Sequence, residues 1–143
     1  MTKSNIDSHN KTFAIFLLPL MALIAPFLVF PIEMVLPYPY IVEEIIKSLL
    51  IINVVKLPSK KIQIFIGICL GVFFAVSETV LYSFNFFMLT SIIPLIERLF
   101  LTSLLHALTI VVMILSNFIN KKLLPLGVIL AMIIHYFYNL LAL

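Results

Sequence analysis

The sequence predicts an all-α integral membrane protein with about five transmembrane helices in one bundle. Of its 143 residues, 64% are hydrophobic and 10% are charged, and the mean hydropathy is +1.26. A soluble domain of this length has too little interior to bury so much apolar surface. A spanning helix needs about 20 apolar residues, so the chain has room for about five spans and little else.

Five apolar runs carry this prediction. They cover residues 13–30, 41–57, 62–82, 92–119 and 123–143. The Pro-rich stretch 31–40 should end the first helix and form the first loop, because proline lacks a backbone donor. The fourth run exceeds the length of a span, so its start at 92–97 is expected to lie along the membrane surface. One transmembrane domain, 13–143, thus follows a cytoplasmic tail, 1–12.

The lysines outside these runs alternate between loops. They precede the first run, separate the second from the third, and separate the fourth from the fifth: Lys3, Lys11, Lys56, Lys60, Lys61, Lys121 and Lys122. The loops around Glu33 and Asn85 carry no lysine or arginine. By the positive-inside rule, the N-terminus is cytoplasmic and the C-terminus lies outside the cell membrane. This placement also argues against nucleic acid as a partner, despite the net charge of +3, and for membrane lipid.

Several ionisable residues fall within the apolar runs or at their ends, where a charge costs at least ~2.5 kcal/mol. They are Glu43, Glu44, Lys47, Glu78, Glu97, Arg98, His106 and His135. The helical rise puts His106 and His135 level, both roughly 12 Å below the outer surface, and Glu78 about 6 Å below it. The second run begins on the same side with Glu43 and Glu44, which come out shallower than the histidines. Polar groups from four helices therefore share one outer layer, which predicts a functional site.

Helical spacing groups some of these residues further. Lys47 lies one turn from both Glu43 and Glu44, so it can neutralise either carboxylate and keep it ionised, as a general base requires. His135 and Asn139 are four residues apart and share a helical face. These two groups of helical neighbours, one in each of two apolar runs, predict which side chains point toward the site.

Each of these ionisable residues, taken alone, also has a purely structural interpretation. The charges that begin the second run can snorkel to the interface as a helix start. Glu97 and Arg98 suit an interfacial anchor. A lone histidine is more often a helix–helix hydrogen bond than a catalyst. Thr102 shares a face with His106 and is expected to orient its ring.

Exclusion narrows the chemistry. Asp7 is the only aspartate, so a two-aspartate protease is ruled out. HExxH and GxSxG are absent, and Cys69 has no histidine nearby in sequence. What remains is carboxylate plus histidine, groups that can activate a water and stabilise the resulting oxyanion.

Four segments resemble, in order, the motifs of the PrsW family of intramembrane proteases. Residues 42–47, Val-Glu-Glu-Ile-Ile-Lys, resemble its EExxK motif, and residues 71–82 resemble FxxxE followed by an apolar residue and Tyr. Arg98 with His106 is similar to the third motif, and His135 with Asn139 to the fourth, HxxxN. The PrsW family belongs to a wider group with the prenyl-protein (CAAX) endopeptidases.

The resemblance implies a role for each of these residues. Glu43 would be the base that activates water, with Glu44 and Lys47 setting its charge. The full catalytic set would be Glu43, Glu44, Lys47, Glu78, Arg98, His106, His135 and Asn139, with His106 holding the water or a metal and His135 and Asn139 forming the oxyanion hole. The resemblance leaves two mechanisms open, one glutamic and one using a divalent metal such as zinc. In the metal-dependent mechanism, the candidate ligands of the metal are Glu43, Glu78, His106 and His135.

The function implied is an intramembrane endopeptidase that hydrolyses a peptide bond of a membrane-anchored protein near the outer face. Two alternatives from other classes stay open. One is a non-catalytic membrane scaffold, the role of a distantly related gamma-secretase subunit. The other is a small proton or ion carrier, because intramembrane glutamates and histidines also form relays.

Overall fold

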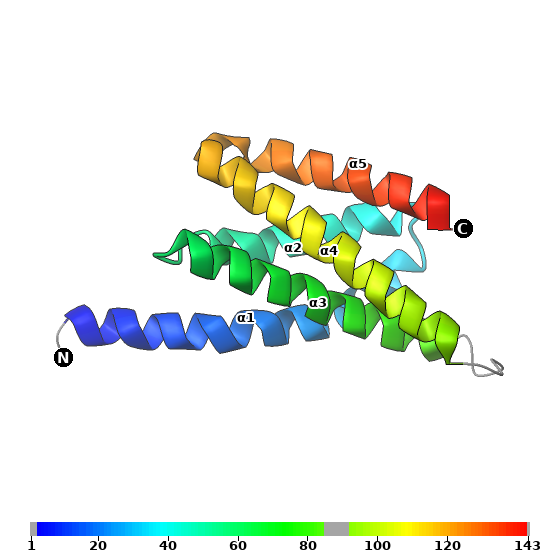
Figure 1. Ribbon diagram of the computed structural model, residues 1–143, viewed down its shortest axis with the longest axis horizontal. Coiled ribbons are helices and arrows are strands. Elements are labelled where there is room, and N and C mark those ends of the chain that lie inside the picture. The colour runs from blue at the N-terminus through cyan, green and yellow to red at the C-terminus, as the bar shows by residue number, and fades with distance from the viewer. Residues whose placement is uncertain (1–2, 85–91, 143) are drawn as a thin grey trace.

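The computed structural model describes the backbone of residues 3–84 and 92–142 and the side chains of residues 15–84 and 92–141. The described chain is a helical bundle without strands (Figure 1). Its elements are α1 (Lys3–Glu33), α2 (Pro39–Val54), α3 (Lys60–Phe84), α4 (Ile93–Ile119), the 3-10 turn η1 (Lys121–Leu123) and α5 (Leu124–Ala142). The predicted all-α fold is confirmed. Residues 85–91, where the loop around Asn85 was predicted, lie outside the described part.

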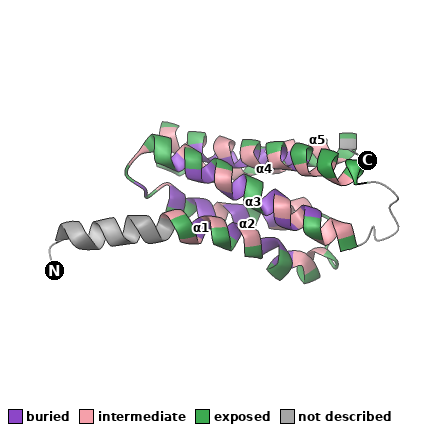
Figure 2. Cartoon of the chain, turned by 60° about the horizontal axis from the view of Figure 1, so that its bottom comes forward, coloured by how far each residue is buried: buried purple, intermediate pink, exposed green. Residues whose placement is uncertain are grey.

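Four helices, α1, α3, α4 and α5, are long and apolar enough to cross a membrane. Large apolar side chains on their outer faces are exposed, as Phe65 (64%) and Leu104 (61%) illustrate. Figure 2 shows how exposed and buried faces alternate around the helices. An exposed apolar surface of this extent suits lipid rather than water, so the chain has the build of a multi-pass membrane protein.

The second predicted span differs from the prediction. Helix α2 has 16 residues, which corresponds to about 24 Å and falls short of a hydrocarbon core of ~30 Å. It lies within the bundle and contacts each of the other four α-helices. Its buried face runs along one stripe of Glu43, Glu44, Lys47, Leu50, Ile51 and Val54. One face of the short helix is therefore covered by protein, while Ile45, Leu49 and Ile52 on the rest of its surface are exposed. The covered face can carry charged groups that lipid would not accept.

The prediction that residues 31–40 form the first loop is wrong at both ends. Helix α1 continues through Pro31 to Glu33, and α2 begins at Pro39. A backbone hydrogen bond of 3.0 Å from Met34 to the Phe30 carbonyl oxygen holds the last turn of α1. Proline at the first position of α2 costs nothing, because a helix leaves that N–H unpaired anyway. The connection shrinks to residues 34–38.

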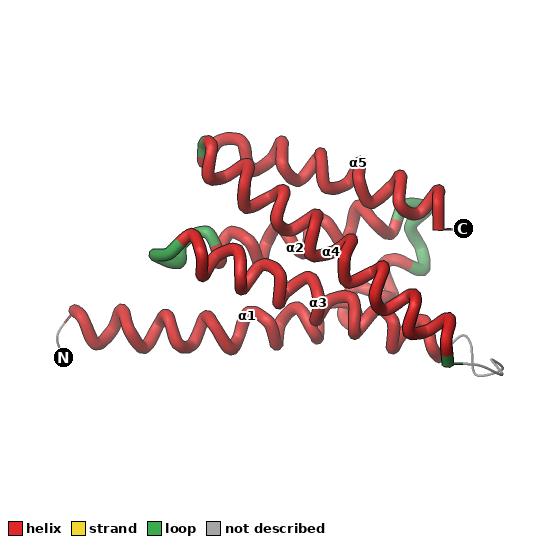
Figure 3. The backbone as a smooth tube through the Cα atoms, in the orientation of Figure 1, coloured by secondary structure: helices red, strands yellow, loops and turns green. Residues whose placement is uncertain are grey.

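Consecutive helices run in opposite directions and are joined by short connections where the structure describes them (Figures 1 and 3). The α2–α3 and α4–α5 connections lie at one end of the bundle, and α2 and α4 begin at the other. Between α2, α3 and α4, the half of the bundle toward the first end is filled by apolar side chains. They include Leu50, Ile51, Val54, Ile66, Leu70, Ile110, Met113 and Ile114.

Helix α3 approaches α4 closely through two glycines four residues apart. A Cβ atom on Gly71 would lie 2.5 Å from the backbone nitrogen of Ala107, and one on Gly67 would lie 2.5 Å from the side-chain end of Ile114. This is the GxxxG pattern of membrane helix pairs, in which small residues let two backbones meet. The contact at Ala107 sets the neighbouring His106 directly against α3.

Candidate active site

The site is built on the buried face of α2. Lys47 has no exposed side-chain surface, and its Nζ donates a hydrogen bond of 2.6 Å to Glu44 Oε1, whose side chain is also fully buried. Glu43 is farther away, with its Oε2 4.0 Å from the same ammonium. The predicted pairing of Lys47 with a carboxylate one turn away is therefore found, with Glu44 as its hydrogen-bonded partner. Glu43 stays within electrostatic reach of the lysine.

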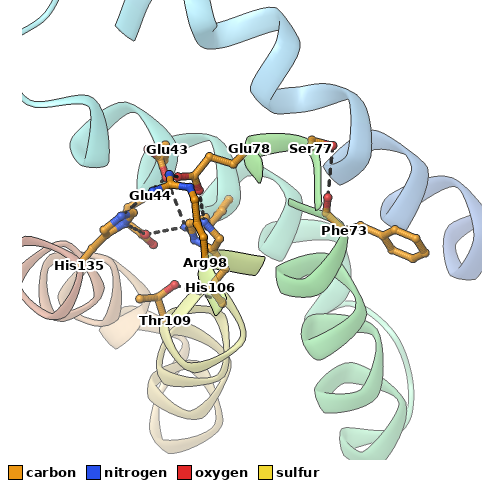
Figure 4. Close-up of polar contacts among 10 residues, drawn as sticks. Glu43, Glu44, Phe73, Ser77, Glu78, Arg98, His106, Thr109 and His135 are labelled. Atoms are coloured by element: carbon orange, nitrogen blue, oxygen red, sulfur yellow. Dashed lines mark hydrogen bonds and ion pairs between the residues drawn. The ribbon is translucent and has the colours of Figure 1, made fainter. Parts of the chain in front are cut away.

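The ammonium of Lys47 also connects α2 to α4. Its Nζ lies 2.5 Å from His106 Nδ1, and His106 Nε2 lies 2.6 Å from Glu78 Oε2 on α3. The other oxygen of Glu78 accepts a hydrogen bond of 2.7 Å from Arg98. An unbroken chain of ionisable groups thus runs across three helices (Figure 4).

The three basic side chains of this network, those of Lys47, His106 and Arg98, all contact one face of α3. Phe74, Glu78 and Tyr82 are spaced by one helical turn each. Lys47 Nζ lies 4.8 Å from the centre of the Phe74 ring, and the Arg98 guanidinium stacks 3.8 Å from that of Tyr82. The aromatic residues of the FxxxE and Tyr pattern thus give these cations apolar and cation–π contacts above and below Glu78.

His135 brings α5 into the same cluster. Its Nδ1 lies 2.8 Å from Glu44 Oε1 and its Nε2 lies 3.9 Å from Glu43 Oε2. The His135 and His106 rings are 5.4 Å apart between centroids, which confirms the estimate that the two histidines are level. The shallow position estimated for Glu43 and Glu44 is corrected: α2 lies inside the bundle and brings both carboxylates to the depth of the rings.

Hydrogen-bond chemistry decides which histidine nitrogen stays available. A lysine ammonium has donors only, so Lys47 donates to His106 Nδ1, and the proton of that neutral ring sits on Nε2, which donates to Glu78. Both nitrogens of His106 are then engaged. His135 donates from Nδ1 to the carboxylate of Glu44, and its Nε2, which faces Glu43, has no hydrogen-bond partner among the described residues.

Two pockets flank this cluster. One, of about 200 Å³, is lined by Glu78, Arg98, Thr102, Leu105, His135, Tyr138 and Asn139. The other, of about 270 Å³, is lined by Phe30, Glu33, Met34, Pro39, Glu43, Glu78, Leu81, Tyr82 and Arg98. The Glu78–Arg98 ion pair lines both pockets. Asn139 is half-buried and lies beside His135 in the first pocket, so the predicted face of α5 does point into the cluster.

A metal ion does not fit this arrangement as it stands. Glu43, His106 and His135 have potential ligand atoms within 4.8 Å of one another. However, a ligand nitrogen needs a free lone pair, and Lys47 already occupies His106 Nδ1 while Glu78 accepts the proton of Nε2. Zinc in catalytic sites takes three protein ligands, and only Glu43 and His135 of this trio are free to supply one. Lys47 instead supplies the positive charge beside the carboxylates.

Two further expectations differ from the structure. Thr102 is buried, but its hydroxyl has no hydrogen-bond partner among the described residues, so Lys47 and Glu78 rather than Thr102 orient the His106 ring. Glu97 is exposed, and Arg98 turns to Glu78 on α3. The expected interfacial pair therefore separates: Arg98 belongs to the cluster and Glu97 does not line either pocket.

Glu33 is a pocket residue that the sequence does not predict. Its position after Pro31 predicts a loop, yet Glu33 completes the last turn of α1 and lines the second pocket with Glu43 and Glu78. Its signal was present: a carboxylate just after an apolar run, on the same side of the membrane as Glu43.

No protein-family profile, curated protein or solved structure matches this chain. The fold and the site by themselves define a multi-pass helical membrane protein with a buried network of ionisable groups from four helices.

Proposed function

We propose that this protein is an intramembrane endopeptidase that hydrolyses a peptide bond of a membrane-anchored protein. The observation that supports this most is the pair formed by Glu43 and His135. Glu43 Oε2 has no hydrogen-bond partner among the described residues and lies 3.9 Å from His135 Nε2, with a pocket on either side. One water bridging the two would have a base and a second acceptor to orient it.

The chemistry follows from these groups. Glu43 takes a proton from the water, the oxygen attacks the peptide carbonyl, and Glu43 returns the proton to the leaving amine. The amide of Asn139, which lines the first pocket, is available to donate a hydrogen bond to the oxyanion. Lys47, held by its hydrogen bond to Glu44, places a positive charge 4.0 Å from the Glu43 carboxylate. His106 connects Lys47 to Glu78 and acts as a positioning residue.

These roles differ for both histidines from those that the PrsW resemblance implies. The resemblance has His106 hold the water that Glu43 activates, and has His135 form the oxyanion hole with Asn139. Since both nitrogens of His106 are engaged, we assign the water to Glu43 and His135. The metal-dependent variant, with zinc held by Glu43, Glu78, His106 and His135, would require Lys47 to leave His106.

The site is proposed to face the outer side of the cell membrane. The α2–α3 and α4–α5 connections lie at one end of the bundle (Figure 1). Five lysines are found there, in the α2–α3 connection, in the first turn of α3 and in η1: Lys56, Lys60, Lys61, Lys121 and Lys122. The positive-inside rule makes that end cytoplasmic. The cluster lies toward the opposite end, where α2 and α4 begin.

A proton carrier is the competing proposal, because the hydrogen-bonded network of ionisable side chains from Arg98 to His135 is continuous. Carriers need a polar route across the membrane. Below the cluster, fully buried apolar side chains such as Ile51, Leu70 and Met113 fill the described bundle. This apolar plug favours a reaction confined to one side over transport across the membrane.

The test is co-reconstitution in liposomes with a panel of single-span proteins whose outer juxtamembrane residues vary. The wild type and Glu97→Gln should release the same soluble fragment, and Glu43→Gln should not. Glu97 provides the matched control, because it is an exposed glutamate outside both pockets. Absence of cleavage by the wild type, together with proton flux in empty liposomes, would instead support the carrier; cleavage by Glu43→Gln at the wild-type rate would refute Glu43 as the base.

A further inference from the structure

The second pocket is lined by more acidic side chains than basic ones. Three carboxylates line it, those of Glu33, Glu43 and Glu78, against the single guanidinium of Arg98. Arg98 is committed to Glu78 at 2.7 Å and to the ring of Tyr82. Glu33 and Glu43 are therefore left without a cationic partner inside the pocket itself.

Both of these carboxylates also have unused hydrogen-bonding capacity. Glu33 Oε1 and Glu43 Oε2 are inaccessible atoms without a hydrogen-bond partner among the described residues. The Glu43 side chain is only 10% exposed, and Lys47, whose Nζ lies 4.0 Å from it, is not among the residues that line the pocket. A buried acceptor without a donor is costly, so this geometry is suited to a ligand that brings donors and positive charge.

The remaining walls are apolar. Phe30, Met34, Leu81 and the ring of Pro39 line the pocket around the carboxylates. A long side chain with an apolar stem and a cationic head matches this combination, because its methylenes pack on apolar surface while its head reaches the acids.

We propose, on the basis of the proposed peptidase function, that this pocket binds the side chain of a lysine or arginine next to the scissile bond. Glu43 lines the pocket and is also the proposed base, so a side chain held there belongs to a residue adjacent to the reacting carbonyl. Glu33, at the end of α1, is the specificity-determining residue, since it contacts the pocket without taking part in the chemistry.

The test compares two single-span substrates that differ only at this position, Lys against Met. Met has a similar length and no charge, so the ratio of the two cleavage rates isolates the charge. The ratio is independent of how much of a variant is folded, because both rates come from the same preparation. Wild type should prefer Lys by about tenfold, the effect expected of one charge-assisted hydrogen bond.

Glu33→Gln should reduce this preference to about twofold or less, while Glu97→Gln should retain it. Glu33→Arg should reverse it in favour of a substrate with Glu at the same position. Equal cleavage of the Lys and Met substrates by wild type, or an unchanged ratio in Glu33→Gln, would overturn the inference and leave the peptidase function intact. Failure of wild type to cleave any member of the panel would refute the peptidase function and this inference with it.

Discussion

Lys47 and His106, on neighbouring helices, are joined by a contact of 2.5 Å between Nζ and Nδ1. This contact links the carboxylates of α2 to Glu78 and Arg98 and makes the cluster one unit. It also sets the tautomer of His106 and thereby leaves His135 as the histidine with a free nitrogen.

Replacement of Lys47 should be strongly destabilising. Lys47→Met keeps the apolar stem but removes the charge between Glu44 and His106, and the loss of one partner of a buried pair costs about 3–5 kcal/mol. Thermal unfolding in detergent micelles measures the effect. Lys61→Met, at an exposed position, is the control and should stay within about 0.5 kcal/mol of wild type. Equal stability of the two variants would show that Lys47 is not paired as described.

The protonation of His106 can be measured directly. In 15N NMR spectra of the histidine side chains in liposomes, His106 should appear as a neutral ring with a protonated Nε2 and an unprotonated Nδ1. His106→Gln provides the assignment, because its signals vanish in that variant. A protonated Nδ1 would mean that Lys47 does not donate to it, and the assignment of the water to His135 would fall.

Chelation should leave peptidase activity unchanged. Because Lys47 occupies the nitrogen that a metal would need, 1,10-phenanthroline should change the cleavage rate by less than about twofold, well below the effect of losing a catalytic zinc. The control is the non-chelating 1,7-isomer. Loss of activity that zinc restores would favour the metal-dependent mechanism and would require Lys47 to move.

The two glycines of α3 should respond differently to alanine. Gly71→Ala places a Cβ 2.5 Å from the Ala107 backbone, which cannot move aside, whereas Gly67→Ala meets the flexible end of Ile114. Gly71→Ala should therefore lower stability by about 1–3 kcal/mol and Gly67→Ala by less. The same unfolding measurement checks this, and the opposite order would contradict the α3–α4 packing.

Composition and helical spacing predicted much of this molecule. The apolar runs gave the helices, and spacing of three or four residues gave the Glu44–Lys47 pair and the shared face of His135 and Asn139. Other features could not be predicted from the sequence, because they depend on contacts between neighbouring helices. The burial of the charged face of α2 follows from the contacts of this helix with four other helices, and hydropathy along one segment carries no such information.

The prediction that Pro31 ends the first helix failed for a local reason. A proline removes one backbone donor, but the residues after it can still form helical hydrogen bonds, as Met34 does with the Phe30 carbonyl oxygen. The partner of Arg98 was equally hidden, because a local pair with Glu97 is what sequence offers. Only the crossing of α3 and α4 makes Glu78 the nearer carboxylate.

The most direct test of the account is a double-mutant cycle on Glu43 and His135, measured as cleavage rates of one substrate in liposomes. If the two residues act on the same water, Glu43→Gln and His135→Gln should each lower the rate by about a thousandfold, and the double variant by little more. Losses that multiply, to about a millionfold within the range of the assay, would show that the residues act independently. That result would contradict a single water held between them.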